Sequence, residues 1–207
     1  MKKINNIGIV IKNGNVATEN AECIVVPEFN SCASYGGVGY AIEVAGIGAG
    51  LETYDKVASD KPFNYGDVLI TESGKLGIKL AHVATVGAKA DEQFGVVLRA
   101  MFQVLVSANS LGLKSIAVPE IGTGIIGTLT PEQSAKAIFA AIAKFTTIYP
   151  EARIEEVTLV IYRGSTAPAE KVLSEQSYIE KNGCIKDMRG EKKFNMAEWL
   201  KEMGLLG

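Results

Sequence analysis

One stretch of the sequence decides the fold: residues 114–127, KSIAVPEIGTGIIG. Its first half is apolar and β-branched, which is typical of a strand covered on both faces. Its second half is a loop with glycines at positions 122, 124 and 127, and the helical pattern that follows begins at Pro131. Glycine lets backbone N–H groups approach an anion closely, and the N-terminus of a helix attracts negative charge. The stretch therefore predicts a strand, a phosphate-binding loop and a helix, in that order.

Similar apolar runs recur along the chain and alternate with segments of helical period. The capping signal is clearest at Thr130, where Pro131 stands at the first helical position and Gln133 three residues after the cap. Strands that alternate with helices predict a three-layer α/β/α sandwich around a mixed, mostly parallel sheet. The predicted strands are residues 7–12, 22–27, 67–71, 80–87, 114–119 and 156–162, and the predicted helices include residues 94–111, 131–149 and 167–175.

Composition excludes several classes of function. The 207 residues carry a net charge of −2, so no overall positive field would attract DNA. The three cysteines lack CxxC spacing, which argues against a disulfide framework and against a zinc site. The one histidine, His82, lies in a strand-like run and is interpreted as a structural residue. No apolar run is long enough to span a bilayer, and we expect a cytoplasmic protein that uses no metal and no cofactor.

A second glycine-containing loop follows the strand at residues 22–27. It reads NSCASYGGVGYAI over residues 30–42. In open α/β sheets the ligand lies outside the carboxyl ends of the strands, so two such loops could face each other across a diphosphate. The triphosphate-binding pattern GxxxxGK[ST] is absent, which argues against magnesium-dependent triphosphate hydrolysis.

Together these residues resemble the macro domain family, over roughly residues 8–175. GNVAT at 14–18 looks like the family's Gly-Asp-Ile-Thr element, and ECIVVPEFNS at 22–31 stands where Asp-Ala-Ile-Val-Asn-Ala-Ala-Asn is usual. GGVGYAI at 36–42 is similar to Gly-Gly-Val-Asp-Gly-Ala-Ile. The stretch at 114–127 looks like Lys-Ser-Ile-Ala-Phe-Pro-Ala-Ile-Ser-Thr-Gly-Ile-Tyr-Gly and is the most specific match.

The resemblance implies binding of ADP-ribose, free or attached to protein. Asn15 would contact the adenine amino group in place of the family's aspartate, Tyr162 would stack on adenine, and Asn30 would lie near the distal ribose. The two glycine loops would hold the diphosphate. The implied ligand-binding residues are Asn15, Val16, Asn30, Gly36, Gly37, Val38, Gly122, Thr123, Gly124, Ile125, Ile126, Gly127 and Tyr162.

Departures from the family pattern bear on catalysis. Hydrolytic members often pair the asparagine that corresponds to Asn30 with an aspartate whose place is taken here by Gly39. Pro27 replaces the first asparagine of the motif, which is more similar to the non-hydrolytic, histone-variant type. Ser31 and Cys32 could act as nucleophiles only beside a base, and none is evident. The sequence places no carboxylate at the ribose; the candidates are Glu43 and Glu120 near the loops, and Asp55 and Asp60 after the first helix.

Three functions remain open at this point. The first is a binding module for ADP-ribose with little or no hydrolase activity. The second is a mono-ADP-ribosyl or O-acetyl-ADP-ribose hydrolase, in which Asn30 is the candidate catalytic residue. The third is an interaction domain whose pocket has been remodelled by Pro27, Glu28 and Phe29 and no longer takes nucleotide.

Residues 1–178 are predicted to form the domain, and residues 179–207 an extension. Within the extension, Met196, Trp199, Leu200 and Met203 recur at helical spacing and predict a short amphipathic helix. Such a helix could pack on the domain, bind a partner or join two copies of the chain.

Overall fold

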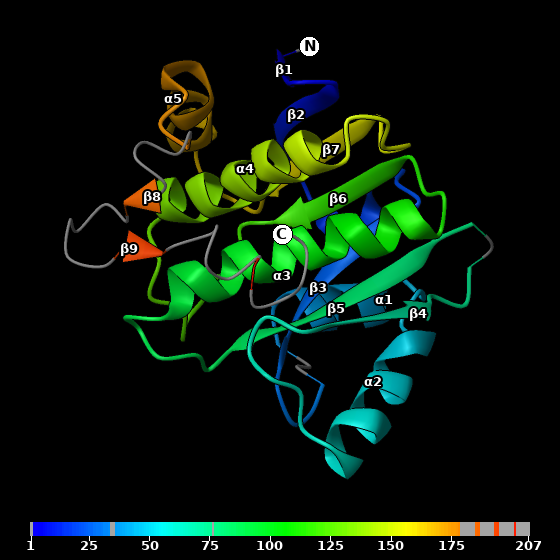
Figure 1. Ribbon diagram of the computed structural model, residues 1–207. Coiled ribbons are helices and arrows are strands. Elements are labelled where there is room, and N and C mark those ends of the chain that lie inside the picture. The colour runs from blue at the N-terminus through cyan, green and yellow to red at the C-terminus, as the bar shows by residue number, and fades with distance from the viewer. Residues whose placement is uncertain are drawn as a thin grey trace.

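The computed structural model describes residues 2–33, 36–75 and 77–178, together with residues 185–186, 193–194 and 201. Seven strands form one sheet in the order β1-β2-β7-β6-β3-β5-β4 (Figure 1). The strands are β1 (Lys2–Ile4), β2 (Ile7–Asn13), β3 (Cys23–Phe29), β4 (Val68–Glu72), β5 (Lys79–Val86), β6 (Ser115–Pro119) and β7 (Glu156–Ile161). The helices are α1 (Val38–Val44), α2 (Ala49–Asp60), α3 (Gln93–Ser110), α4 (Pro131–Ile148) and α5 (Ala167–Glu175), with a 3₁₀ turn η1 (Val16–Thr18).

The centre of the sheet is parallel and both of its edges are antiparallel. Strands β2, β7, β6, β3 and β5 run in one direction, whereas β1 pairs antiparallel with β2 and β4 pairs antiparallel with β5. Figure 1 shows α3 and α4 across one face of the sheet, with α1 on the opposite face. The expected three-layer α/β/α sandwich with a mixed, mostly parallel sheet is confirmed.

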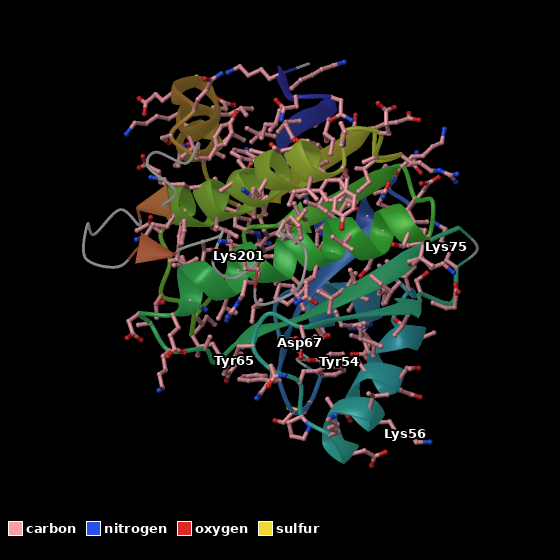
Figure 2. All side chains as sticks on the ribbon, in the orientation of Figure 1. Tyr54, Lys56, Tyr65, Asp67, Lys75 and Lys201 are labelled. Atoms are coloured by element: carbon pink, nitrogen blue, oxygen red, sulfur yellow. The ribbon has the colours of Figure 1, made fainter. Side chains whose placement is uncertain are left out.

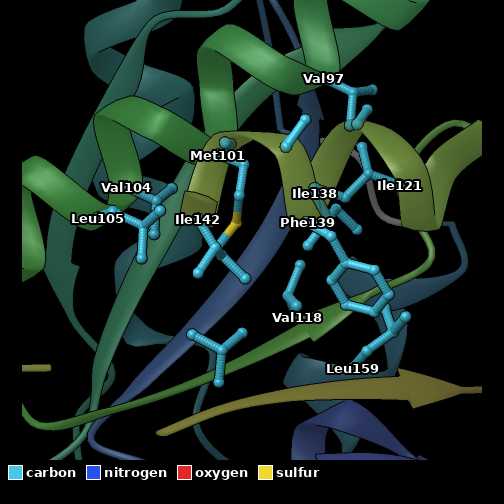
Figure 3. Close-up of a cluster of buried hydrophobic side chains, with 14 of the residues drawn as sticks. Val97, Met101, Val104, Leu105, Val118, Ile121, Ile138, Phe139, Ile142 and Leu159 are labelled. Carbon is cyan, nitrogen blue, oxygen red and sulfur yellow. The ribbon is translucent and has the colours of Figure 1, made fainter. Parts of the chain in front are cut away.

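The larger part of the core lies between the sheet and the helices α3 and α4. Side chains from both helices pack against those of β6 and β7. Figure 3 shows Phe139 of α4 in this cluster with Val118 of β6 and Leu159 of β7. All three of these residues are fully buried. Burial of such side chains is the main source of stability for a domain of this size.

The opposite face of the sheet carries a smaller core formed by η1, α1 and α2. Val16, Ile42 and Leu51 come from these three elements and pack against Ile24 and Val160 of the sheet. Both η1 and α1 therefore pack on this face of the sheet, next to the carboxyl ends of the parallel strands.

Several local expectations are confirmed and others need correction. The capping box of α4 is present, with Thr130 Oγ1 accepting from the Gln133 N–H at 3.2 Å and Gln133 Oε1 accepting from the Thr130 N–H at 2.9 Å. Asp55 and Asp60 do follow the first helix, α1, as expected, but both lie within a second helix, α2, that the sequence analysis did not predict. The buried positions Leu51, Tyr54 and Ala58 of α2 recur at helical spacing, a signal the sequence did contain.

The extension is described at only five residues. Lys193–Phe194 is a strand, β9, that pairs antiparallel with β8 (Ile185–Lys186). The amphipathic helix expected around Trp199 lies outside the described residues, apart from Lys201, which is helical.

Candidate functional site

The loops that carry the expected site residues all follow the carboxyl ends of parallel strands in the sheet. Parallel strands end at the same edge, and β2, β7, β6 and β3 are consecutive neighbours in the sheet. Asn15 follows β2, Tyr162 follows β7, the loop of Gly122 follows β6, and Asn30 follows β3. The topology therefore arranges these residues in a row, in the order Asn15, Tyr162, Gly122 and Asn30.

Asn15 caps the 3₁₀ turn η1. Its Oδ1 accepts a hydrogen bond from the Ala17 N–H at 3.1 Å, while Val16 is buried in the smaller core. The chain is tied to the neighbouring strand by the Gly14 N–H, which donates to the Ile161 carbonyl at 3.0 Å. Asn15 is thereby fixed beside the end of β7, where Tyr162 emerges.

Tyr162 is an exposed aromatic residue at the end of a buried strand. Its side chain is 65% exposed although the preceding residue, Ile161, is fully buried. The guanidinium of Arg163 lies over the ring, 5.0 Å from its centroid. An aromatic face presented to solvent beside a binding loop is suited to stacking on a planar base.

The loop of residues 122–127 folds back on itself through backbone hydrogen bonds. The Gly127 N–H donates to the Gly124 carbonyl at 2.8 Å, and the Leu129 N–H donates to the Gly122 carbonyl at 3.0 Å. A Cβ on Gly127 would lie 2.1 Å from the Gly122 oxygen, so only glycine permits this fold. Thr123 Oγ1 donates to the Glu120 carbonyl at 2.9 Å, and Ile125 is fully exposed.

The first glycine loop leads into α1. Gly36 and Gly37 are exposed, Gly37 is the N-cap of α1, and Val38 is the first residue of that helix. Helix α1 packs on η1, so this loop approaches the end of the sheet from the same face as Asn15. Gly39 is buried in the first turn of α1, and α1 supplies no carboxylate from that position.

Asn30 lies directly after β3 and is held through its backbone. The Phe63 N–H donates to the Asn30 carbonyl at 2.8 Å. Within the described residues no hydrogen bond engages the Asn30 side chain.

The candidate carboxylates have different surroundings. Glu43 and Asp60 are exposed on α1 and α2. Glu120 follows β6 and is half-buried; its Oε1 is enclosed with no partner among the described residues, and burial raises the pKa of this carboxyl. Asp55 reaches the loop of Asn30, where its Oδ1 accepts from the Ala33 N–H at 3.1 Å, a placement that the sequence did not reveal.

Glu28 does not lie in a phosphate loop. It is fully buried, and its Oε1 is 3.2 Å from Nδ1 of His82, which is buried as well. His82 is thus a structural residue on a strand, as expected. The pairing of Glu28 with His82 could not be found from the sequence, because 54 residues separate the two.

The described residues hold no cluster of three or more histidine, cysteine, aspartate or glutamate side chains that could bind a metal ion. In the same part of the chain, none of the helices has the length and apolar character needed to cross a membrane.

Sequence comparison finds relatives of this chain in several organisms. An uncharacterized protein of Thermotoga maritima is 31% identical over 157 residues, which are 73% of this chain and 26% of that protein. The chain therefore spans about a quarter of the length of this relative. An ADP-ribose glycohydrolase of Archaeoglobus fulgidus is 29% identical over 189 residues, 84% of this chain and 96% of that protein.

Solved structures share the fold. The macrodomain of Oceanobacillus iheyensis with ADP superposes with a TM-score of 0.73 at 22% identity, over 85% of this chain and 95% of that one. The Macro domain family matches residues 19–138, more than half of the chain, and this segment includes β3, β6 and both glycine loops. The chain belongs to the macro domain family.

Proposed function

We propose that this protein binds ADP-ribose, free or attached to another protein, along the carboxyl edge of its parallel strands. The observation that carries the proposal is the order of the residues along the carboxyl ends of the strands: Asn15 and Tyr162, then the glycine loop of residues 122–127, then Asn30. ADP-ribose has the same sequence of parts, which are adenine, diphosphate and distal ribose.

The chemistry of each loop suits the part that it would meet. The exposed ring of Tyr162 offers a stacking surface, and the Asn15 amide oxygen, which has a second lone pair, can accept a hydrogen bond from the adenine amino group. The backbone of residues 122–127 and the N-terminus of α1 offer N–H groups to the diphosphate. The ADP found with the Oceanobacillus iheyensis macrodomain is the adenine and diphosphate part of the same ligand.

Calorimetric titration with ADP-ribose, ADP and AMP tests the proposal. We expect ADP-ribose to bind most tightly, ADP less tightly and AMP weakest, because each step removes one set of contacts. Failure to bind any of the three would contradict the proposal and would favour the third function, an interaction domain that does not take nucleotide.

A second candidate function is hydrolysis of the bond between ADP-ribose and an attached group. In its favour are the relative named as an ADP-ribose glycohydrolase, the Asn30 amide and the placement of Asp55 at the loop that carries Asn30. Against it is Gly39, because hydrolysis needs a group that holds or activates a water.

Incubation with an ADP-ribosylated peptide separates the two functions. Release of ADP-ribose by the wild-type protein, but not by Asn30→Ala, would establish hydrolysis. Binding of the peptide without release would leave the protein as a binding module.

A further inference from the structure

A chain of buried polar side chains lies between the sheet and α2, outside the row of loops described above. His82 on β5 connects two other strands: its Nε2 is 2.8 Å from Oγ1 of Thr71 on β4, and its Nδ1 is 3.2 Å from Oε1 of Glu28 on β3. Buried polar groups cost free energy unless they are paired, so these contacts orient the imidazole ring strongly.

The oriented imidazole supports Tyr54 of α2. The Tyr54 and His82 rings are stacked, with centroids 5.0 Å apart and planes 20° apart, and Phe63 stacks on Tyr54 at 5.2 Å. Figure 2 labels Tyr54 of α2 and Asp67, whose charge acts on the tyrosine hydroxyl. Burial raises the pKa of Tyr54, and the charge of Glu28 raises it further, so the hydroxyl stays protonated and can donate.

That hydroxyl donates to the backbone at the start of the Asn30 loop. Tyr54 Oη lies 2.6 Å from the Phe29 carbonyl oxygen, one residue before Asn30. The pairing of β3 with β5 shifts register between Glu28 and Phe29. The Tyr54 hydroxyl therefore binds the backbone at the point where the regular hydrogen bonding between these two strands is interrupted.

Two further contacts fix the same loop. The Phe63 N–H donates to the Asn30 carbonyl. Asp55, which follows Tyr54 in α2, accepts a hydrogen bond from the Ala33 N–H. The loop is therefore held at Phe29, Asn30 and Ala33 by α2 and by the segment that follows it.

Gly50 allows α2 to approach closely enough for these contacts. A Cβ on Gly50 would lie 1.9 Å from Thr71 Oγ1 and 2.8 Å from the Glu72 carbonyl oxygen. Helix α2 therefore rests directly on the strand β4 that carries Thr71, the hydroxyl at one end of the polar chain.

We propose that Tyr54 and Asp55 are positioning residues for Asn30, and that they set the share of ligand affinity contributed by the distal ribose. This inference rests on the proposed function, because Asn30 is the residue expected at that ribose. The adenine contacts and the diphosphate contacts of residues 122–127 come from the loops after β2, β7 and β6, which α2 does not hold. The diphosphate contacts at the N-terminus of α1 lie farther along the Asn30 loop, so loosening that loop should weaken binding of ADP-ribose more than binding of ADP.

The test compares the ratio of the dissociation constants for ADP and ADP-ribose in matched variants. Tyr54→Phe removes only the hydroxyl and keeps the stacked ring, and Asp55→Ala removes the acceptor while Asp55→Asn retains one. We expect Tyr54→Phe and Asp55→Ala to lower the ratio about threefold to tenfold, the range for the loss of one hydrogen bond. Asp55→Asn should stay close to wild type.

Two controls make the comparison specific. Tyr149→Phe changes a tyrosine at the end of α4, and Glu52→Ala removes an exposed carboxylate from the first turn of α2. Neither should alter the ratio. An unchanged ratio in Tyr54→Phe and Asp55→Ala, or an equal loss for both ligands, would overturn the inference.

Failure of the proposed function would look different. If wild-type protein binds neither ligand, both proposals fall, and amide hydrogen exchange of residues 30–33 then shows whether Tyr54 still restrains the loop. If Tyr54→Phe does not fold, Asp55→Ala decides the question alone, because Asp55 is only partly buried.

Discussion

Individual side chains at the edge of the sheet differ in how strongly the fold holds them. Tyr162 and Ile125 are exposed and have no role in the core, whereas Val16 and Gly39 are buried. Exposed aromatic and aliphatic residues beside a binding loop are the ones that a ligand could cover. At the residue scale, the site is therefore best tested by substitutions that do not disturb the core.

Tyr162→Ala should weaken the binding of ADP and of ADP-ribose to a similar degree. Stacking of a base on an aromatic ring contributes about 1–3 kcal/mol, and both ligands contain adenine. Tyr162→Phe keeps the ring and should bind almost as wild type. Calorimetry on the three proteins checks this, and a loss confined to ADP-ribose would place Tyr162 at the distal ribose instead.

Glu120→Gln should stabilise the protein at neutral pH. Burial raises the pKa of this carboxyl above its ordinary value of 4.5, so the folded state binds its proton more tightly than the unfolded state does. The proton's contribution to the free energy of unfolding is fully present when the pH is below the ordinary glutamate pKa. It is lost as the pH rises through the pKa that Glu120 has in the folded state.

Urea unfolding of wild type and Glu120→Gln at pH 7 and near pH 4 measures this effect. We expect a gain of up to about 1 kcal/mol at pH 7, because the carboxyl is still partly hydrated, and a smaller gain near pH 4. Glu170→Gln, an exposed change on α5, is the control. A gain that is the same at both pH values would contradict the role given to the proton.

At the scale of elements, the loop of residues 122–127 depends on one close backbone approach. Gly127→Ala should abolish ADP-ribose binding and lower stability, because its Cβ would lie 2.1 Å from the Gly122 oxygen and the loop would have to open. Strain of this kind costs about 1–3 kcal/mol.

Gly124→Ala is the matched control, since no atom lies within 4 Å of a Cβ placed there. Thermal unfolding should distinguish the two variants, with a lower midpoint for Gly127→Ala only. Equal midpoints would show that the loop tolerates a side chain at 127. Loss of binding in Gly124→Ala at an unchanged midpoint would mean that the new methyl group meets the ligand itself.

At the scale of the whole molecule, the expected ligand contacts and the described core residues lie before residue 179. Tyr178 packs edge-on against Phe139 with ring centroids 5.9 Å apart, and α5 adds Val172 and Leu173 to the main core. A chain that ends at Tyr178 should therefore fold and bind ADP-ribose like the chain of 207 residues.

A chain that ends at residue 166 serves as the comparison, because it lacks α5 and should be much less stable. Calorimetry and thermal unfolding of the two truncated chains check the expectation. Loss of binding in the chain that ends at Tyr178 would assign residues 179–207 a part in the site. If the 207-residue chain is an oligomer and the chain that ends at Tyr178 is a monomer, residues 179–207 join copies of the chain.

The sequence by itself determined the features that depend on near neighbours along the chain. The apolar run before Pro119, the glycines from Gly122 to Gly127 and the cap at Thr130 predict a strand, a loop and a helix from local rules of backbone geometry and burial. The alternation of such units indicated the three-layer architecture, and resemblance to the family supplied the candidate residues of the site. Helix α2 was missed, although its buried positions carry a helical period.

Only the tertiary structure decided what distant residues do to one another. The order of β2, β7, β6 and β3 in the sheet places Asn15, Tyr162 and Asn30 along one edge, and no local pattern contains that order. The contact of Glu28 with His82 and the bond from Tyr54 to Phe29 join residues 54 and 25 positions apart. Such contacts form only after the strands have paired and the helices have packed, because their geometry is set by the sheet and not by the segments that carry the residues.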